Sequence, residues 1–136
     1  AQYPEEVWDD VMAVNLRAPF VLTQELLPLL QKSENASVVF ASSGVGREAR
    51  AEWGAYSVSK IAIEAVSQIF AKENTYPNIR YNCVNPGGTR TAMRAKAYPQ
   101  EDPKVLPTPE AIMPAYLYLM GDDSLHMNGE SIDAQD

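Results

Sequence analysis

Short apolar runs of strand-forming residues alternate with longer helical stretches along this chain of 136 residues. The pattern predicts strands at 37–41, 79–84 and 129–133, and helices at 4–32, 53–75 and 108–120. Parallel strands need a long crossover connection, which is usually a helix. The alternation therefore predicts an α/β fold with a parallel sheet of three strands and helices on both faces.

Prolines help to define the predicted helices. Pro4 suits the first turn of the first helix, and Pro19 is expected to kink it, which frees backbone groups near Asn15. Thr108 and Pro109 form a helix start, with the threonine as N-cap and the proline at the first helical position.

Tyr56 and Lys60 lie four residues apart in the predicted helix 53–75, so they share one helix face. A tyrosine phenol titrates near pH ~10, and a lysine charge about 5 Å away favours its ionised form by roughly 3 kcal/mol. The pair is thus a candidate acid–base pair, although the spacing alone is common by chance. Ser43 strengthens the prediction because it follows a strand, at the sheet edge where open α/β sheets bind ligands.

Three sequence segments resemble the short-chain dehydrogenase/reductase family. They are Ser43 followed by "GAYSVSK" (54–60), "NCVNPGGTRTAM" (82–93) and the upstream "VMAVNLRAPFVLTQ" (11–24). Segment 91–124 is similar, more particularly, to the YciK-type bacterial oxidoreductases. The resemblance implies an NAD(P)-dependent oxidoreductase that interconverts a carbonyl and an alcohol by hydride transfer.

The resemblance also implies four catalytic residues. Tyr56 would be the general acid/base, and Lys60 would lower its pKa and hold the nicotinamide ribose. Ser43 would hydrogen-bond the substrate carbonyl, and Asn15 would hold a water in a proton relay to Lys60.

Cofactor binding by this resemblance involves Tyr56 and Lys60 together with the loop after the second predicted strand. In that loop Pro86 and Gly87 would lie beside the nicotinamide, Thr89 against its carboxamide, and Thr91 would hydrogen-bond the cofactor. The expected cofactor is NAD(P)(H), with NADP favoured over NAD, and the expected partner is a small-molecule carbonyl or alcohol.

Two family motifs are missing from the sequence. Neither the glycine-rich Gly-x-x-x-Gly-x-Gly turn nor the Asn-Asn-Ala-Gly segment occurs. We therefore interpret residues 1–136 as a single partial domain, the carboxyl-terminal, catalytic half of a Rossmann-like doubly wound sheet, and expect it to be inactive alone. A non-catalytic oligomeric remnant is the alternative. An epimerase or dehydratase of the extended family branch is disfavoured because "NPGGTRTAM" resembles the short oxidoreductase form.

Two further features of a complete enzyme follow from the resemblance. The helices that carry Asn15 and Tyr56 would form a homo-dimer or tetramer interface. Segment 92–107 contains three prolines and follows the cofactor loop, so it is either a substrate loop or a plain linker.

Composition excludes several other classes of protein. The net charge of −7 argues against nucleic acid and anionic membrane surfaces as partners. The sequence has no apolar run of membrane-spanning length and no leader signal, so we expect a cytoplasmic protein. A single cysteine, Cys83, and a single histidine, His126, do not support a Cys/His metal site, and we expect Cys83 to be buried.

Overall fold

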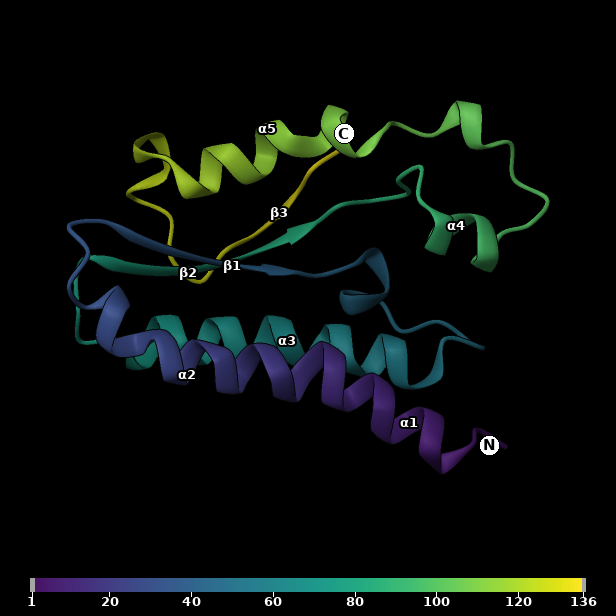
Figure 1. The fold of residues 1–136 in the computed structure, drawn as a ribbon, viewed down its shortest axis with the longest axis horizontal. Helices are drawn as coiled ribbons and strands as arrows, with labels where there is room; N and C mark the ends of the chain where they lie inside the picture. Colours follow the sequence, from purple (N-terminus) through teal and green to yellow (C-terminus); the bar gives the residue numbers. More distant parts are fainter. Residues whose placement is uncertain (1, 136) are drawn as a thin grey trace.

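The sheet contains three parallel strands in the order β1–β2–β3 (Figure 1). In the computed structural model, which describes residues 2–135, the strands are β1 (Ala36–Ala41), β2 (Ile79–Asn85) and β3 (Ser131–Asp133). Ala36 pairs with Ile79, and the register continues to Ala41 opposite Val84. Because β2 is central, the second edge of β1 has no strand beside it in the described part of the chain.

Helices cover both faces of this sheet, as predicted. Three of them, α1 (Glu5–Met12), α2 (Ala18–Leu30) and α3 (Gly54–Glu73), pack on one face, and α5 (Pro109–Met120) lies on the other (Figure 1). A short helix, α4 (Ala92–Ala97), stands beyond the carboxyl ends of the strands. Short 3-10 turns occur at Gly44–Gly46, Pro103–Val105 and Asp122–Ser124.

The predicted helix at 4–32 is divided by a π-helical segment, Ala13–Arg17. Pro19 has no backbone N–H to donate to the carbonyl of Asn15 four residues earlier, which explains why the regular ladder is interrupted here. Pro4 is the N-cap of α1 and lies just before its first turn. The prediction of a disturbed backbone at Asn15 is thus confirmed, whereas Pro4 lies one position earlier than expected.

One predicted boundary needs correction, and the structure adds detail to two other predicted segments. The last strand begins at Ser131 and not at 129, because Gly129 has a φ of 82° that belongs to a turn. Thr108 is the N-cap of α5, but its hydroxyl accepts no capping hydrogen bond from the helix. The segment predicted as a loop at 92–107 includes α4 and one of the 3-10 turns.

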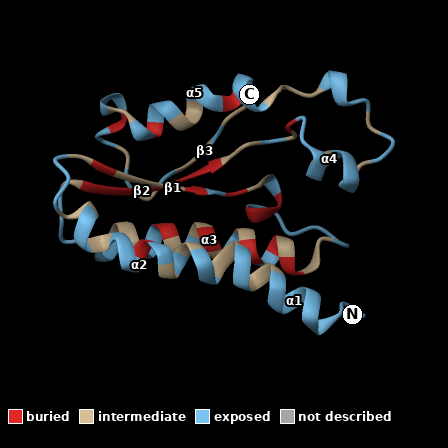
Figure 2. Ribbon diagram, viewed as in Figure 1, coloured by how far each residue is buried: buried red, intermediate tan, exposed pale blue. Residues whose placement is uncertain are grey.

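The core lies between the sheet and the inner face of α3, where buried residues concentrate in Figure 2. Its buried cluster contains Ala36, Phe40, Ile63, Ile79, Tyr81 and Cys83. Phe70 packs against both Phe40 and Tyr81, with ring centroids 6.4 and 5.3 Å away. Cys83 is buried as predicted, and burial raises the pKa of its thiol to about 11.

Replacing Ile63 with alanine should destabilise the fold strongly. Ile63 is 2% exposed at the centre of the cluster, so the substitution removes buried apolar area and leaves a cavity. Such substitutions cost about 2–5 kcal/mol of unfolding free energy. The matched control is Leu117→Ala on α5, where the side chain is 63% exposed. Urea unfolding of both variants tests the assignment, and equal losses of stability would contradict it.

Candidate active site

A pocket of about 370 Å³ lies beyond the carboxyl ends of β1 and β2. It is bounded by the first turn of α3, the loop after β2, α4 and the start of α5. Its lining includes six site residues predicted from the sequence, which are Ser43, Tyr56, Pro86, Gly87, Thr89 and Thr91. Six of the eight predicted site residues therefore meet in one pocket, at the sheet edge where open α/β sheets bind ligands.

Tyr56 enters the pocket from the first turn of α3. The helix begins at Gly54, which has a φ of 45°, a conformation that glycine adopts readily. The half-buried Tyr56 ring packs against Trp53, with ring centroids 5.5 Å apart. The turn thus fixes the tyrosine at the pocket and not inside the core.

Lys60 lies one turn further along α3. Its Nζ is 5.5 Å from the centre of the Tyr56 ring and donates a hydrogen bond of 2.9 Å to the Ala41 carbonyl at the end of β1. Burial lowers the pKa of the Lys60 ammonium from its ordinary value. The prediction that Tyr56 and Lys60 share one helix face is confirmed. Lys60, however, lines a second hollow, separate from the pocket that contains Tyr56.

Asn15 lines this second hollow together with Lys60. The hollow is a groove of about 570 Å³ between the π-helical segment and β1. Asn15 Nδ2 donates to the Ser59 hydroxyl at 3.2 Å, and that hydroxyl donates to the Tyr56 carbonyl at 2.8 Å. Asn15 is therefore linked to the helix that carries Tyr56 and Lys60, although it does not touch the first pocket.

The turn that carries Ser43 is held by a polar network that sequence reasoning missed. Glu64, one turn after Lys60, accepts hydrogen bonds from Ser42 at 2.5 Å and from Ser131 on β3 at 3.0 Å. A Cβ at Gly46 would lie 2.9 Å from the Lys60 carbonyl oxygen in the backbone of α3, so only glycine lets this turn approach α3 so closely. The carboxylate of Glu64 thus joins β1, α3 and β3 behind Ser43.

The loop after β2 is shaped by internal hydrogen bonds. Gly87 has a φ of 67°, and the Gln135 side chain donates to the carbonyl of Pro86 at 2.6 Å. Thr89 is buried and its hydroxyl also donates to the Pro86 carbonyl, at 3.2 Å. Thr91 accepts a bond from the Arg94 backbone N–H as the N-cap of α4. No local sequence pattern predicted that Gln135, which follows β3 in the chain, would bind this loop.

The remaining pocket wall comes from the segment that was predicted as a substrate loop or linker. Residues from this segment and its neighbours that line the pocket are Trp53, Met93, Arg94, Ala97, Tyr98, Pro109 and Ile112. Four of them, Met93, Arg94, Ala97 and Tyr98, belong to segment 92–107, so this segment forms part of the pocket wall. No residue of this wall was predicted as a site residue from the sequence, because no spacing rule predicts which side of α4 faces the pocket.

Two further features of residues 2–135 bear on function. No cluster of three or more His, Cys, Asp or Glu side chains is arranged to hold a metal ion in this part of the chain. No helix among the same residues has the length and apolar character needed to cross a membrane.

Comparison with known proteins adds a family assignment. Residues 1–102 match the family model described as short chain dehydrogenase. The oxidoreductase YciK of Escherichia coli K12 is 59% identical over 130 residues, which cover 96% of this chain and 51% of YciK. The chain thus spans about half the length of this relative.

Solved structures agree with this assignment. The structure of YciK from E. coli superposes with a TM-score of 0.95 and 57% identity, covering 99% of this chain and 55% of that one. A short chain dehydrogenase from E. coli CFT073, complexed with NADPH, also gives a TM-score of 0.95 at 57% identity, covering 99% of this chain and 56% of that structure. The fold described above is therefore the fold of these relatives over the matched half.

Proposed function

Because this chain belongs to the short-chain dehydrogenase family of oxidoreductases, we propose that it is the catalytic half of an NADP(H)-dependent enzyme that interconverts a carbonyl and an alcohol. One observation carries the proposal. Ser43, Tyr56 and the 86–91 loop line a single pocket, and Lys60 lies one helical turn from the tyrosine. A hydroxyl donor, a proton donor and a neighbouring cation are the groups that a carbonyl reduction needs.

The chain's own groups fit a nicotinamide nucleotide at this place. The 86–91 loop supplies backbone groups and the Thr89 and Thr91 hydroxyls at the pocket beside Tyr56. Lys60 uses one of its three donors on the Ala41 carbonyl, which leaves two for the hydroxyls of a ribose. When bound, the nicotinamide supplies or accepts the hydride. NADP is favoured because two structural relatives are complexes with NADP and NADPH.

The proposed mechanism assigns proton handling to this chain. Tyr56 donates its phenolic proton to the carbonyl oxygen during reduction and takes it back in the reverse direction. Ser43 donates a hydrogen bond to the same oxygen and so orients it, while the Lys60 ammonium stabilises the negative charge left on Tyr56. The groove beside Lys60 and Asn15 provides a polar route by which a water can return the proton.

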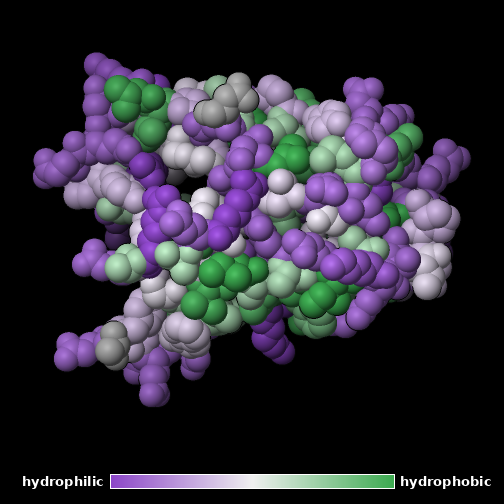
Figure 3. All heavy atoms as spheres, turned by 180° about the vertical axis from the view of Figure 1, so that it is seen from behind, coloured by the Kyte–Doolittle hydropathy of each residue, from purple (hydrophilic) through white to green (hydrophobic). Residues whose placement is uncertain are grey.

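We also propose that the face formed by α1, α2 and α3 makes a homo-oligomer contact. Hydrophobic side chains are exposed along these helices, and Figure 3 shows green patches among polar ones along the lower, helical layer. The exposed residues include Val14, Leu22 and Leu29, and on α3 Ile61 and Ile69. Sedimentation of the whole protein as a monomer would contradict this contact.

Cofactor titration tests the proposed function. We expect the whole protein to bind NADPH more tightly than NADH, seen as a change in cofactor fluorescence, and to oxidise NADPH when a carbonyl compound is added. The chain of residues 1–136 alone should bind neither, because it lacks the glycine-rich turn. A whole protein that binds neither cofactor would favour the non-catalytic alternative. Saturable binding by the chain alone would contradict our placement of the dinucleotide.

A further inference from the structure

The pocket beside Tyr56 is lined mainly by apolar and aromatic side chains. Trp53 comes from the start of α3, Met93 and Tyr98 from α4 and its end, and Ile112 from α5. Arg94 is the one charged residue in the lining that the described residues provide. The chemical character of the bound molecule therefore depends on whether the charge of Arg94 is available to it.

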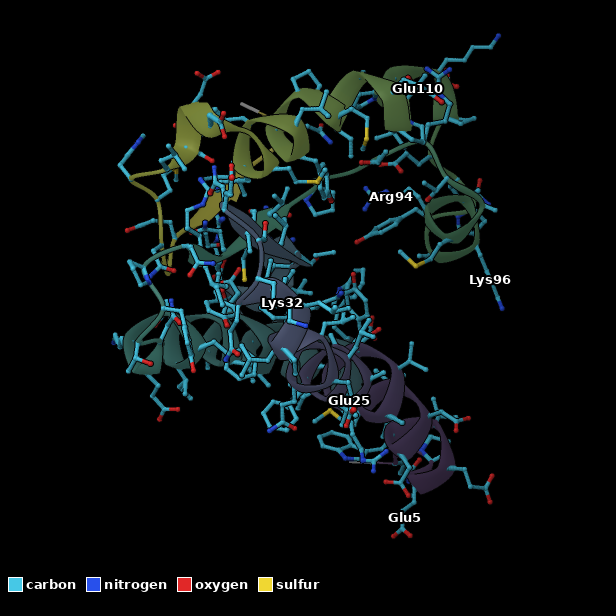
Figure 4. The ribbon with its side chains drawn as sticks, turned by 60° about the vertical axis from the view of Figure 1, so that its left-hand side comes forward. Glu5, Glu25, Lys32, Arg94, Lys96 and Glu110 are labelled. Atoms are coloured by element: carbon cyan, nitrogen blue, oxygen red, sulfur yellow. The ribbon has the colours of Figure 1, made fainter. Side chains whose placement is uncertain are left out.

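The charge of Arg94 is already neutralised by Glu101. Arg94 Nε and Nη2 donate to the two carboxylate oxygens of Glu101 at 2.6 and 2.7 Å, a bidentate pair. The pair lowers the pKa of the Glu101 carboxyl, so Glu101 is ionised at neutral pH. Figure 4 shows Arg94 directed from α4 toward the body of the protein, whereas Lys96 of the same helix points away from it.

Arg94 also holds in place the aromatic side of the pocket, called here the Tyr98 wall, which consists of Tyr98 and Trp53. Its guanidinium lies over the Tyr98 ring, with Cζ 3.7 Å from the ring centre. The Tyr98 ring contacts Trp53, with centroids 6.1 Å apart, and Trp53 contacts Tyr56 at 5.5 Å. The ion pair is therefore the outer end of a row of contacting side chains, Arg94, Tyr98 and Trp53, that finishes at the proposed proton donor, Tyr56.

We propose that this pocket takes a neutral, largely apolar carbonyl compound, and that Arg94 and Glu101 are positioning residues that hold the Tyr98 wall and do not bind an anion. The inference rests on the proposed function and names its substrate class. The volume of about 370 Å³ is at the small end of ligand pockets. An anionic substrate would lose its hydration beside apolar side chains and meet a cation that is already paired.

Atoms and electrons balance in the reduction of such a carbonyl compound. The carbonyl carbon gains a hydride from the reduced nicotinamide, and the carbonyl oxygen gains the Tyr56 proton, which solvent then replaces. The products are a secondary or primary alcohol and the oxidised nicotinamide, and no further oxidant or reductant is required.

Two ketones that differ only in charge test the substrate class. Acetophenone and 4-acetylbenzoate share the ring and the acetyl group, but the second carries a carboxylate. In NADPH oxidation by the whole protein, we expect kcat/KM to be at least about tenfold higher for acetophenone, mainly through KM. A preference for 4-acetylbenzoate would overturn the inference, because Arg94 would then be an anion site.

A Glu101→Gln variant separates a positioning role from an anion-binding one. Removing the paired charge frees that of Arg94, so the preference for acetophenone should fall several-fold through a lower KM for 4-acetylbenzoate. The control is Glu25→Gln, a carboxylate exposed on α2 and absent from the pocket lining. If the ratio of kcat/KM for acetophenone to that for 4-acetylbenzoate did not change in Glu101→Gln, the proposal that Glu101 neutralises the charge of Arg94 would be contradicted.

Trp53 fluorescence distinguishes this inference from the proposed reaction. Of the two tryptophans in residues 1–136, Trp53 lies in the pocket wall, so quenching that disappears in Trp53→Phe reports a ligand in the pocket. Acetophenone should quench Trp53 at lower concentrations than 4-acetylbenzoate does. If that holds without any NADPH oxidation, the substrate class stands and the proposed reaction fails. If neither ketone quenches Trp53, the pocket assignment itself is wrong.

Discussion

Replacing Tyr56 with phenylalanine is expected to lower turnover of the whole protein by about 10³- to 10⁴-fold. The substitution removes only the phenolic oxygen, and the ring can keep its contact with Trp53. Because the lost group carries the proton and not the cofactor, the NADPH dissociation constant should change little. Steady-state NADPH oxidation and cofactor fluorescence measure the two effects separately.

The matched control for this substitution is Tyr118→Phe. Tyr118 lies on α5, is 38% exposed and does not line the pocket. We expect it to leave both turnover and cofactor affinity unchanged. Near-normal turnover in Tyr56→Phe would show that another group supplies the proton, and the acid/base assignment would then be abandoned.

Replacing Lys60 with alanine should impair cofactor binding and turnover together. The substitution removes a charged donor, and one hydrogen bond to a charged group is worth about 1.5–3 kcal/mol, so NADPH should bind about tenfold or more weakly. It also removes the positive charge that stabilises ionised Tyr56, so kcat should fall by about a hundredfold. Fluorescence titration measures the loss of NADPH affinity, and kinetics at saturating NADPH measure the loss of kcat.

Loss of the Lys60 bond to the Ala41 carbonyl could also weaken the fold, so stability must be measured in parallel. Lys72→Ala is the control, because Lys72 is exposed in the last turn of the same helix. An unchanged unfolding midpoint with reduced NADPH affinity supports the ribose contact. Normal cofactor affinity in Lys60→Ala would remove that contact from the proposal.

The sequence predicted best those features that depend on neighbouring residues. β1 and β2 lie within one residue of their predicted bounds, because β1 is a short apolar run and β2 places Ile79, Tyr81 and Cys83 at alternate positions, and turn residues follow each strand. The pairing of Tyr56 with Lys60 followed in the same way from the helical repeat. The family resemblance correctly brought Ser43 and the 86–91 loop to one pocket, which spacing alone does not reveal.

The features that sequence reasoning missed depend on contacts between distant segments. Glu64 binds Ser42 and Ser131, which are 22 and 67 residues away in the chain. Arg94 and Glu101 are seven residues apart and lie on either side of the end of α4, so the helical i, i+4 rule could not pair them. The division of the site into two hollows, with Tyr56 in one and Asn15 and Lys60 in the other, likewise required the fold.

The edge of β1 that has no strand partner among residues 2–135 lies beside part of the candidate site. The backbone groups of that edge run beside the groove that contains Asn15 and Lys60. A strand that docks there would satisfy those groups and at the same time wall in the two side chains. Pairing at that edge would therefore complete the sheet and enclose the Lys60 side of the candidate site in the same step.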